Sequence, residues 1–158
     1  MNRKNLTVLI SVLTLAAGAV SQNTSVMNIN DEIRKSLEVA KVLGSQMKAW
    51  NDHDLDGFMK GYWKSPELTF FSGGTERHGW QETMDRYKAT YQSPGHEMGQ
   101  LEFANMRTEM LGPEAAFVRG EWHLTMPDGK SPHGLFTLIF RKFPDGWKIV
   151  HDHTSSAE

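Results

Sequence analysis

Cysteine is absent from the 158 residues of this chain. Its absence excludes disulfide bonds, thiolate nucleophiles and every metal site that needs a cysteine ligand. A chain of this length suits one domain with one hydrophobic core. We therefore expect a single domain that is held together by its own apolar packing.

Concentrated positive charge is also scarce. The chain has 17 Lys and Arg against 19 Asp and Glu, a formal net charge of −2, and no basic cluster. Because nucleic-acid binding normally requires clustered Lys and Arg, no nucleic-acid partner is predicted. The sequence also lacks a phosphate-binding loop, a dinucleotide fingerprint and a nucleophile motif, and we predict no cofactor.

The N-terminal residues differ from the rest of the chain. Arg3 and Lys4 precede an almost uncharged apolar run, residues 6–20, that closes with small residues. This layout is typical of a secretory signal peptide, and the alternative, a membrane anchor, normally needs roughly 20 apolar residues. We expect residues 1–21 to be cleaved and residues 22–30 to form a linker. The mature protein, with a formal charge of −4, is then periplasmic or secreted and does not contact the membrane.

Helical periodicity begins at Asp31. Apolar residues recur at steps of three and four, which predicts a helix with one apolar stripe. The predicted stripe consists of Ile33, Leu37, Ala40, Leu43, Met47 and Trp50. The segment Asn51–Asp54 breaks the pattern and supplies a cap for a second, short helix, which carries Leu55, Phe58, Met59 and Tyr62. A third helix is predicted after Gly79, with Trp80, Met84, Tyr87 and Tyr91 along one side.

The remaining segments have the pattern of strands separated by turn residues. They cover Glu67–Ser72, Thr75–His78, His96–Met110, Glu114–Met126, His133–Phe143 and Trp147–Thr154. Helices followed by a run of antiparallel strands predict an α+β domain over residues 31–155. Its three helices would pack on one face of a strongly curved, mainly antiparallel sheet.

Two Pro-Asp-Gly turns predict the register of the last three strands. If each is a three-residue hairpin loop, Phe143 pairs with Trp147 across the last turn. Arg119 then lies beside Thr137, and Leu138 lies opposite Asp152. Because side chains alternate along a strand, two faces follow. The apolar face, expected under the helices, carries Val118, Gly120, Trp122, Leu124, Phe136, Leu138, Phe140, Val150 and Asp152. The mixed face carries Phe117, Arg119, Glu121, His123, His133, Thr137, Ile139, Arg141, Trp147, Ile149, His151 and His153.

A His-x-His pair, His151 and His153, lies on the predicted mixed face. Two such residues bind zinc when a third ligand such as Glu121 arrives from a neighbouring strand, which would suit a metal hydrolase. The alternative is that both histidines, with His123, lie at a subunit interface. We predict the interface, and no metal site.

Asp152 is the one charged residue on the predicted apolar face. Burial would raise the pKa of its carboxyl group and make it an acid or base useful near neutral pH. The alternative is that the strand end is exposed and Asp152 is a surface residue. Tyr62 and Tyr87 are candidate phenol donors, and Ser72 and Thr83 are candidate hydroxyl groups, unless they only complete the edge of the core.

Two segments, AWNDHDLDG at residues 49–57 and GWKIVHDHTS at residues 146–155, carry a resemblance to a known fold. With the order of elements, they resemble the NTF2-like superfamily. Within it they are similar to SnoaL-like domains of the DUF4440 type and to the association domain of calcium/calmodulin-dependent protein kinase II. The resemblance implies a cone of three helices and a bent sheet around a pocket, commonly dimeric through the outer sheet face.

The resemblance also bears on the pocket. Ketosteroid isomerases share the cone, but the positions that resemble their base and their two oxyanion donors are Ser72, Gln46 and Leu138. The pocket arginines of the kinase association domain correspond to Trp122, Leu138 and Thr154. Neither the isomerase site nor the arginine-lined site is therefore expected here.

The resulting functional hypothesis is an exported homodimeric domain that holds a small, largely apolar or aromatic molecule in its cone. The candidate ligand-binding residues are Tyr62, Ser72, Thr83, Tyr87, Trp122, Leu138 and Thr154. Asp152 is the candidate catalytic residue for an isomerase, dehydratase or cyclase-like reaction without a cofactor. The alternative is a non-catalytic binding or oligomerisation module, like the kinase association domain.

Overall fold

The structure, a computed structural model, describes residues 13–157, with side chains from residue 28 onward. The chain divides into two compact units, residues 1–34 and residues 35–158. Residues 1–12 of the predicted signal peptide lie outside the described residues, so cleavage and export stay predictions. No helix among the described residues is long and apolar enough to cross a membrane.

Helix α1 (Leu13–Asn51) begins well before Asp31, where the sequence pattern places its start, and residues 22–30 are helical. In the second unit, its buried stripe consists of Val39, Leu43, Gln46 and Trp50. The predicted stripe was offset from this one, since Leu37 is 59% exposed. The core covers the side of α1 that carries the polar Gln46, which an apolar pattern cannot indicate.

Two short helices complete the helical layer. Helix α2 (Leu55–Met59) is capped as predicted, because the Asp54 carboxylate accepts a hydrogen bond from the backbone N–H of Gly57 at 2.7 Å. Helix α3 (Trp80–Tyr91) has the predicted bounds. The Trp80 indole N–H donates to the Met59 carbonyl at 3.1 Å, which links α3 to the end of α2.

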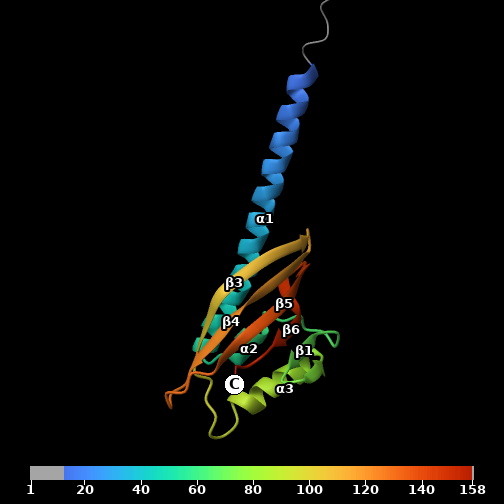
Figure 1. Ribbon diagram of the computed structural model, residues 1–158. Helices are drawn as coiled ribbons and strands as arrows, with labels where there is room; N and C mark the ends of the chain where they lie inside the picture. Colours follow the sequence, from blue (N-terminus) through green and yellow to red (C-terminus); the bar gives the residue numbers. More distant parts are fainter. Residues whose placement is uncertain (1–12, 158) are drawn as a thin grey trace, which may run out of the picture. The chain divides into compact units, whose positions relative to one another are not determined.

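The strands form one curved, open sheet in the order β2-β1-β6-β5-β4-β3. Strand β1 is parallel to β6 and all other neighbours are antiparallel. In Figure 1, strands β3 to β6 curve across the last turns of α1 and across α2. The predicted α+β fold is confirmed. The bounds are β1 (Thr69–Ser72), β2 (Thr75–His78), β3 (Gln100–Gly112), β4 (Ala115–Thr125), β5 (His133–Phe143) and β6 (Gly146–Thr154).

The predicted register is confirmed where it bears on the inner face. Arg119 pairs with Thr137 across β4 and β5, and Leu138 pairs with Asp152 across β5 and β6. Val118, Leu124, Phe136, Leu138, Phe140 and Asp152 are buried on the side of the helices.

Near the last turn the predicted faces were wrong. Phe143 pairs with Gly146 rather than with Trp147, and Val150 is an extra residue in β6 that restores the register at Ile139 and His151. A two-residue turn followed by a one-residue β-bulge has the same length as a three-residue loop. Between turn and bulge the alternation is inverted. Trp147 and Ile149 are therefore 3% and 1% exposed, and Val150 is only half-buried.

Candidate functional site

A cavity of about 100 Å³ lies within the second unit, between the helices and the inner face of the sheet. Aromatic rings form much of its wall. The ring centroids of Trp50 and Phe58 lie 5.1 Å apart, those of Trp50 and Tyr91 4.8 Å, and those of Phe58 and Tyr87 5.2 Å. Of the described residues that line the cavity, only Asp152 and Arg86 carry a formal charge. The site therefore combines an apolar wall with a small polar centre.

Asp152 is the centre of the polar group. Its strand β6 lies between β1 and β5, where Asp152 pairs with Phe70 on one side and with Leu138 on the other. The residue is 3% exposed, so it is not the surface residue that an exposed strand end would leave. The Tyr62 hydroxyl donates to its Oδ2 atom and the Thr154 hydroxyl donates to its Oδ1 atom, both at 2.7 Å.

Burial raises the pKa of Asp152 to about 6, because an ionised carboxylate loses its hydration inside the fold. The hydrogen bonds from Thr154 and Tyr62 and the positive charge of Arg86 favour the ionised form and limit this rise in pKa. The carboxyl group is therefore close to its midpoint in mildly acidic to neutral solution. At such a pH it is able both to release and to accept a proton.

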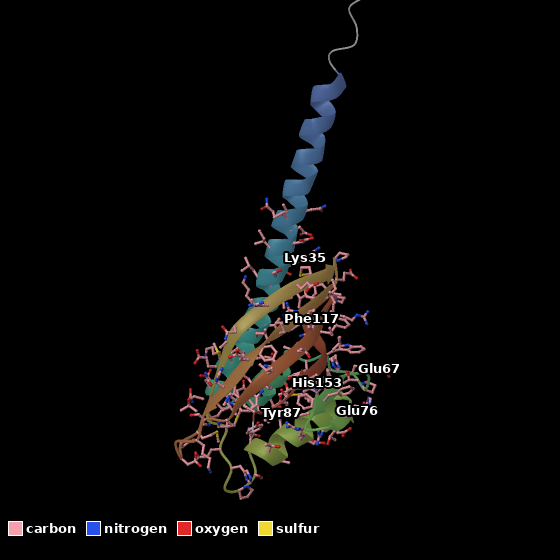
Figure 2. All side chains as sticks on the ribbon, viewed as in Figure 1. Lys35, Glu67, Glu76, Tyr87, Phe117 and His153 are labelled. Atoms are coloured by element: carbon pink, nitrogen blue, oxygen red, sulfur yellow. The ribbon has the colours of Figure 1, made fainter. Side chains whose placement is uncertain are left out.

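Tyr62 and Tyr87 bring two phenols to the same place. Their hydroxyl oxygens lie 3.4 Å apart, and Tyr87, labelled in Figure 2, comes from α3. Burial raises the pKa of both phenols, and the nearby Asp152 charge raises each further. Both remain protonated at neutral pH, so Tyr62 donates to Asp152, and Tyr87 is able to donate to the Tyr62 oxygen or to a bound molecule.

Arg86 is a lining residue that the sequence pattern did not indicate. Its guanidinium carbon lies 4.9 Å from the ring centroid of Phe70 and 5.5 Å from that of Tyr87. Its Nη2 atom donates to the Ser72 hydroxyl at 3.5 Å. A charged residue beside a helical apolar stripe is usually a solvated surface residue, and only its contacts with Phe70 and Tyr87 reveal that it reaches the cavity.

Most of the residues selected from the sequence come together in this cavity. Tyr62, Ser72, Tyr87, Trp122, Leu138 and Thr154 all line it with Asp152. Thr83 does not. It is a fully buried residue of α3, and its hydroxyl donates to the Gly79 carbonyl at 3.0 Å. Its sequence signal, a hydroxyl on the inner side of α3, cannot distinguish a pocket residue from one that satisfies the first turn of the helix.

The segment after β6 closes one side of the cavity. The Trp122 indole N–H donates to the Ser155 carbonyl at 3.0 Å, and Ser156 lines the cavity. Gly134 makes this approach possible, because a Cβ atom at this position would lie 1.9 Å from the Ser155 oxygen. The missing side chain at Gly134 thus leaves room for the Ser155 backbone, and the Ser155 carbonyl holds the Trp122 indole by a hydrogen bond.

The histidines of β4, β5 and β6 lie on the outer face of the sheet. The His151 Nδ1 atom is 2.7 Å from the Thr69 hydroxyl, and His153 is exposed. His123 stacks on His133 with centroids 5.7 Å apart and lies 3.2 Å from Glu121. Among the described residues, no group of three His, Asp or Glu side chains is placed to hold a metal ion.

Known proteins share this architecture. The family model of the SnoaL-like domain matches residues 39–157. A solved NTF-2 like protein of unknown function from Shewanella oneidensis is 38% identical, with a TM-score of 0.71, over 76% of this chain and 98% of its own. No curated protein matches the sequence.

More distant structures share the fold alone. An NTF2-like superfamily protein from Salmonella enterica is 20% identical, with a TM-score of 0.67, over 80% of this chain and 94% of its own. A candidate calcium/calmodulin-dependent protein kinase type II association domain from Thiobacillus denitrificans is 17% identical. Its TM-score is 0.62, over 74% of this chain and 93% of its own. Both resemblances predicted from the sequence are thus confirmed at the level of the fold.

Proposed function

We propose that this chain, which belongs to the SnoaL-like family of NTF2-like domains, binds a small, largely apolar or aromatic molecule in its cone. Domains of this fold in general bind small ligands. The observation that supports the proposal is the cavity itself, in which an aromatic wall surrounds one buried carboxyl group. Apolar walls with a few polar groups that orient the ligand are typical of small-molecule sites.

The size of the cavity limits the ligand. Its volume of about 100 Å³ is somewhat smaller than the roughly 150 Å³ of an apolar cavity that accepts benzene. A short branched chain is therefore the largest ligand that fits the cavity as it stands, and a single substituted ring fits only when the wall rearranges to admit it. The hydroxyl groups of Tyr62 and Thr154 are beside Asp152 and would orient a polar substituent of that ligand.

Substitution of Leu138 tests this proposal. Leu138 is 4% exposed and lines the cavity, so Leu138→Trp is expected to fill the cavity and abolish binding of a single-ring probe such as benzamide. Leu111→Trp is the control, since Leu111 is 54% exposed on β3 and does not line the cavity. Isothermal titration calorimetry measures both, after circular dichroism establishes that each variant folds. Equal binding by the two variants would place the ligand elsewhere.

We further propose a reaction for the case that the protein is an enzyme. Asp152 would then act as a general acid or base in an isomerase, dehydratase or cyclase-like step. A carboxyl group with a pKa of about 6 exchanges protons near neutral pH and needs no cofactor for it. Tyr62 would hold the carboxylate in place and stabilise its ionised form. Asp152→Asn then abolishes turnover, and unchanged turnover would eliminate this mechanism.

A non-catalytic assembly module is the second candidate. Leu135 is 61% exposed on the outer sheet face, which also carries His123, His151 and His153. We propose that this face forms a homodimer interface, as domains of this fold often oligomerise. Light scattering is expected to give the mass of a dimer for the wild type and of a monomer for Leu135→Glu. A monomeric wild type would exclude the dimer.

Export is proposed from the N-terminal sequence alone. If residues 1–21 form a signal peptide, the N-terminus of the mature protein follows the small residues near Ser21. N-terminal sequencing of the protein from its native cells measures this directly, and an intact Met1 would refute it.

A further inference from the structure

The two charged side chains of the cavity differ in how well their hydrogen-bonding groups are used. Both carboxylate oxygens of Asp152 accept hydrogen bonds, one from Tyr62 and one from Thr154. Arg86 has five N–H donors, and its one hydrogen bond, to the Ser72 hydroxyl, is long at 3.5 Å. Most donors of the guanidinium group are therefore not engaged by side chains.

Arg86 also lacks a carboxylate partner among the described residues, since none forms an ion pair with it within 4.0 Å. The rings of Phe70 and Tyr87 hold its guanidinium carbon at 4.9 Å and 5.5 Å from their centroids. Such packing positions a cation without using its donors. Arg86 is half-buried and lines the same cavity as the aromatic wall.

We propose that Arg86 is the specificity residue of the cone and that it selects small aromatic or aliphatic monocarboxylates. The planar guanidinium group offers two parallel N–H donors that match a carboxylate. The ring or chain of such a ligand would lie against the apolar wall, and its carboxylate would replace the weak contact with Ser72. This inference rests on the proposed function, because it assumes that the cone holds a small molecule.

Asp152 makes this binding dependent on pH. The groups that face its carboxyl are the Tyr62 and Thr154 hydroxyls, the Tyr87 phenol and the Arg86 cation, with the charge of His153 acting from its own strand. A ligand carboxylate beside Arg86 is repelled by ionised Asp152 and not by protonated Asp152. Because the pKa of Asp152 is about 6, the preference for an anionic ligand weakens as pH rises through that value.

Benzoate and benzamide test the proposal, because they share a ring and a planar substituent and differ in charge. Calorimetric titrations near pH 5 and near pH 7.5 compare the wild type with Arg86→Gln. Near pH 5 the wild type is expected to bind benzoate at least about tenfold more tightly than benzamide. Near pH 7.5 this ratio of affinities is expected to be smaller. Arg86→Gln is expected to bind the two probes equally. Lys88→Gln is the matched control, as it removes an exposed cation from the same helix.

The outcomes separate this inference from the proposed function. Equal binding of benzoate and benzamide by the wild type would overturn the role of Arg86 and leave the apolar pocket standing. Binding of neither probe at either pH would overturn both. If Arg86→Gln does not fold, the wild-type preference and its pH dependence still decide. Arg86→Lys keeps the positive charge and loses the two parallel N–H donors of the guanidinium group. It is then expected to retain part of the preference for benzoate.

Discussion

At the scale of single residues, the buried carboxylate of Asp152 lowers the free energy of unfolding at neutral pH. An ionised carboxylate with a pKa of about 6 in the folded state, against 3.8 in the unfolded chain, destabilises the fold at neutral pH by about 3 kcal/mol. The hydrogen bonds from Tyr62 and Thr154 already offset part of the loss of hydration. A buried charge that lowers stability is expected at a functional site rather than in a passive core.

Asp152→Asn tests this cost. The folded state binds more protons than the unfolded state between about pH 4 and pH 6, so the wild type loses stability as pH rises through this window and none further above it. We expect the variant to be more stable than the wild type by about 1 to 2 kcal/mol near pH 8 and less stable by a similar amount near pH 4, a change of about 3 kcal/mol between the two pH values. Urea unfolding at several pH values measures it.

Asp85→Asn is the control for that experiment, since Asp85 is an exposed carboxylate on α3 and its removal takes the same charge from the surface. A variant at Asp152 that is less stable than the wild type across the whole pH range would contradict the account of the buried charge. It would mean that the hydrogen bonds of the carboxylate outweigh its desolvation.

At the scale of elements, the close packing of the segment after β6 on strand β5 depends on one glycine. Gly134 lies directly under the Ser155 carbonyl, which in turn accepts the hydrogen bond of the Trp122 indole. A side chain at this position has to displace backbone atoms rather than the flexible end of a side chain. The wall of the cavity near Trp122 is therefore coupled to the packing of the terminal segment.

We expect Gly134→Ala to destabilise the protein by about 1 to 3 kcal/mol. We expect Gly44→Ala to stabilise it by up to about 1 kcal/mol, because Gly44 lies inside α1 with no atom within 4 Å of the added methyl group. Thermal unfolding compares the two substitutions, which add the same methyl group. A stability loss of the same size at both positions would show that the contact at Ser155 is not the cause.

The sequence predicts where helices and strands begin and end better than it predicts which side of the sheet each residue faces. The bounds of α3 and β5 agree with the pattern because the periodicity of the apolar residues and the turn residues at the ends indicate the same limits. Trp147 and Ile149 were assigned to the wrong face because a bulge at Val150 has no sequence signal of its own.

At the scale of the whole molecule, helices and sheet form the walls of one small cavity that brings distant residues together. Tyr62, Arg86 and Asp152 are far apart in the chain, and only the packing of α3 and of the loop after α2 on β6 makes them neighbours. The hairpin register that places Asp152 opposite the apolar Leu138 was enough to predict that Asp152 points inward. The contribution of Arg86 could not be predicted, since it depends on the path of a long side chain across Phe70 and Tyr87.

The central claim is that the cone is a ligand site. Methyl-resolved NMR during titration with benzamide tests it most directly. Leu43, Leu138 and Ile149 line the cavity, whereas Leu111 and Leu135 are exposed by 54% and 61%. We predict saturable shifts of the first three methyl signals and none of the last two. Shifts confined to Leu111 and Leu135, or no saturable shift at all, would contradict a binding site in the cone.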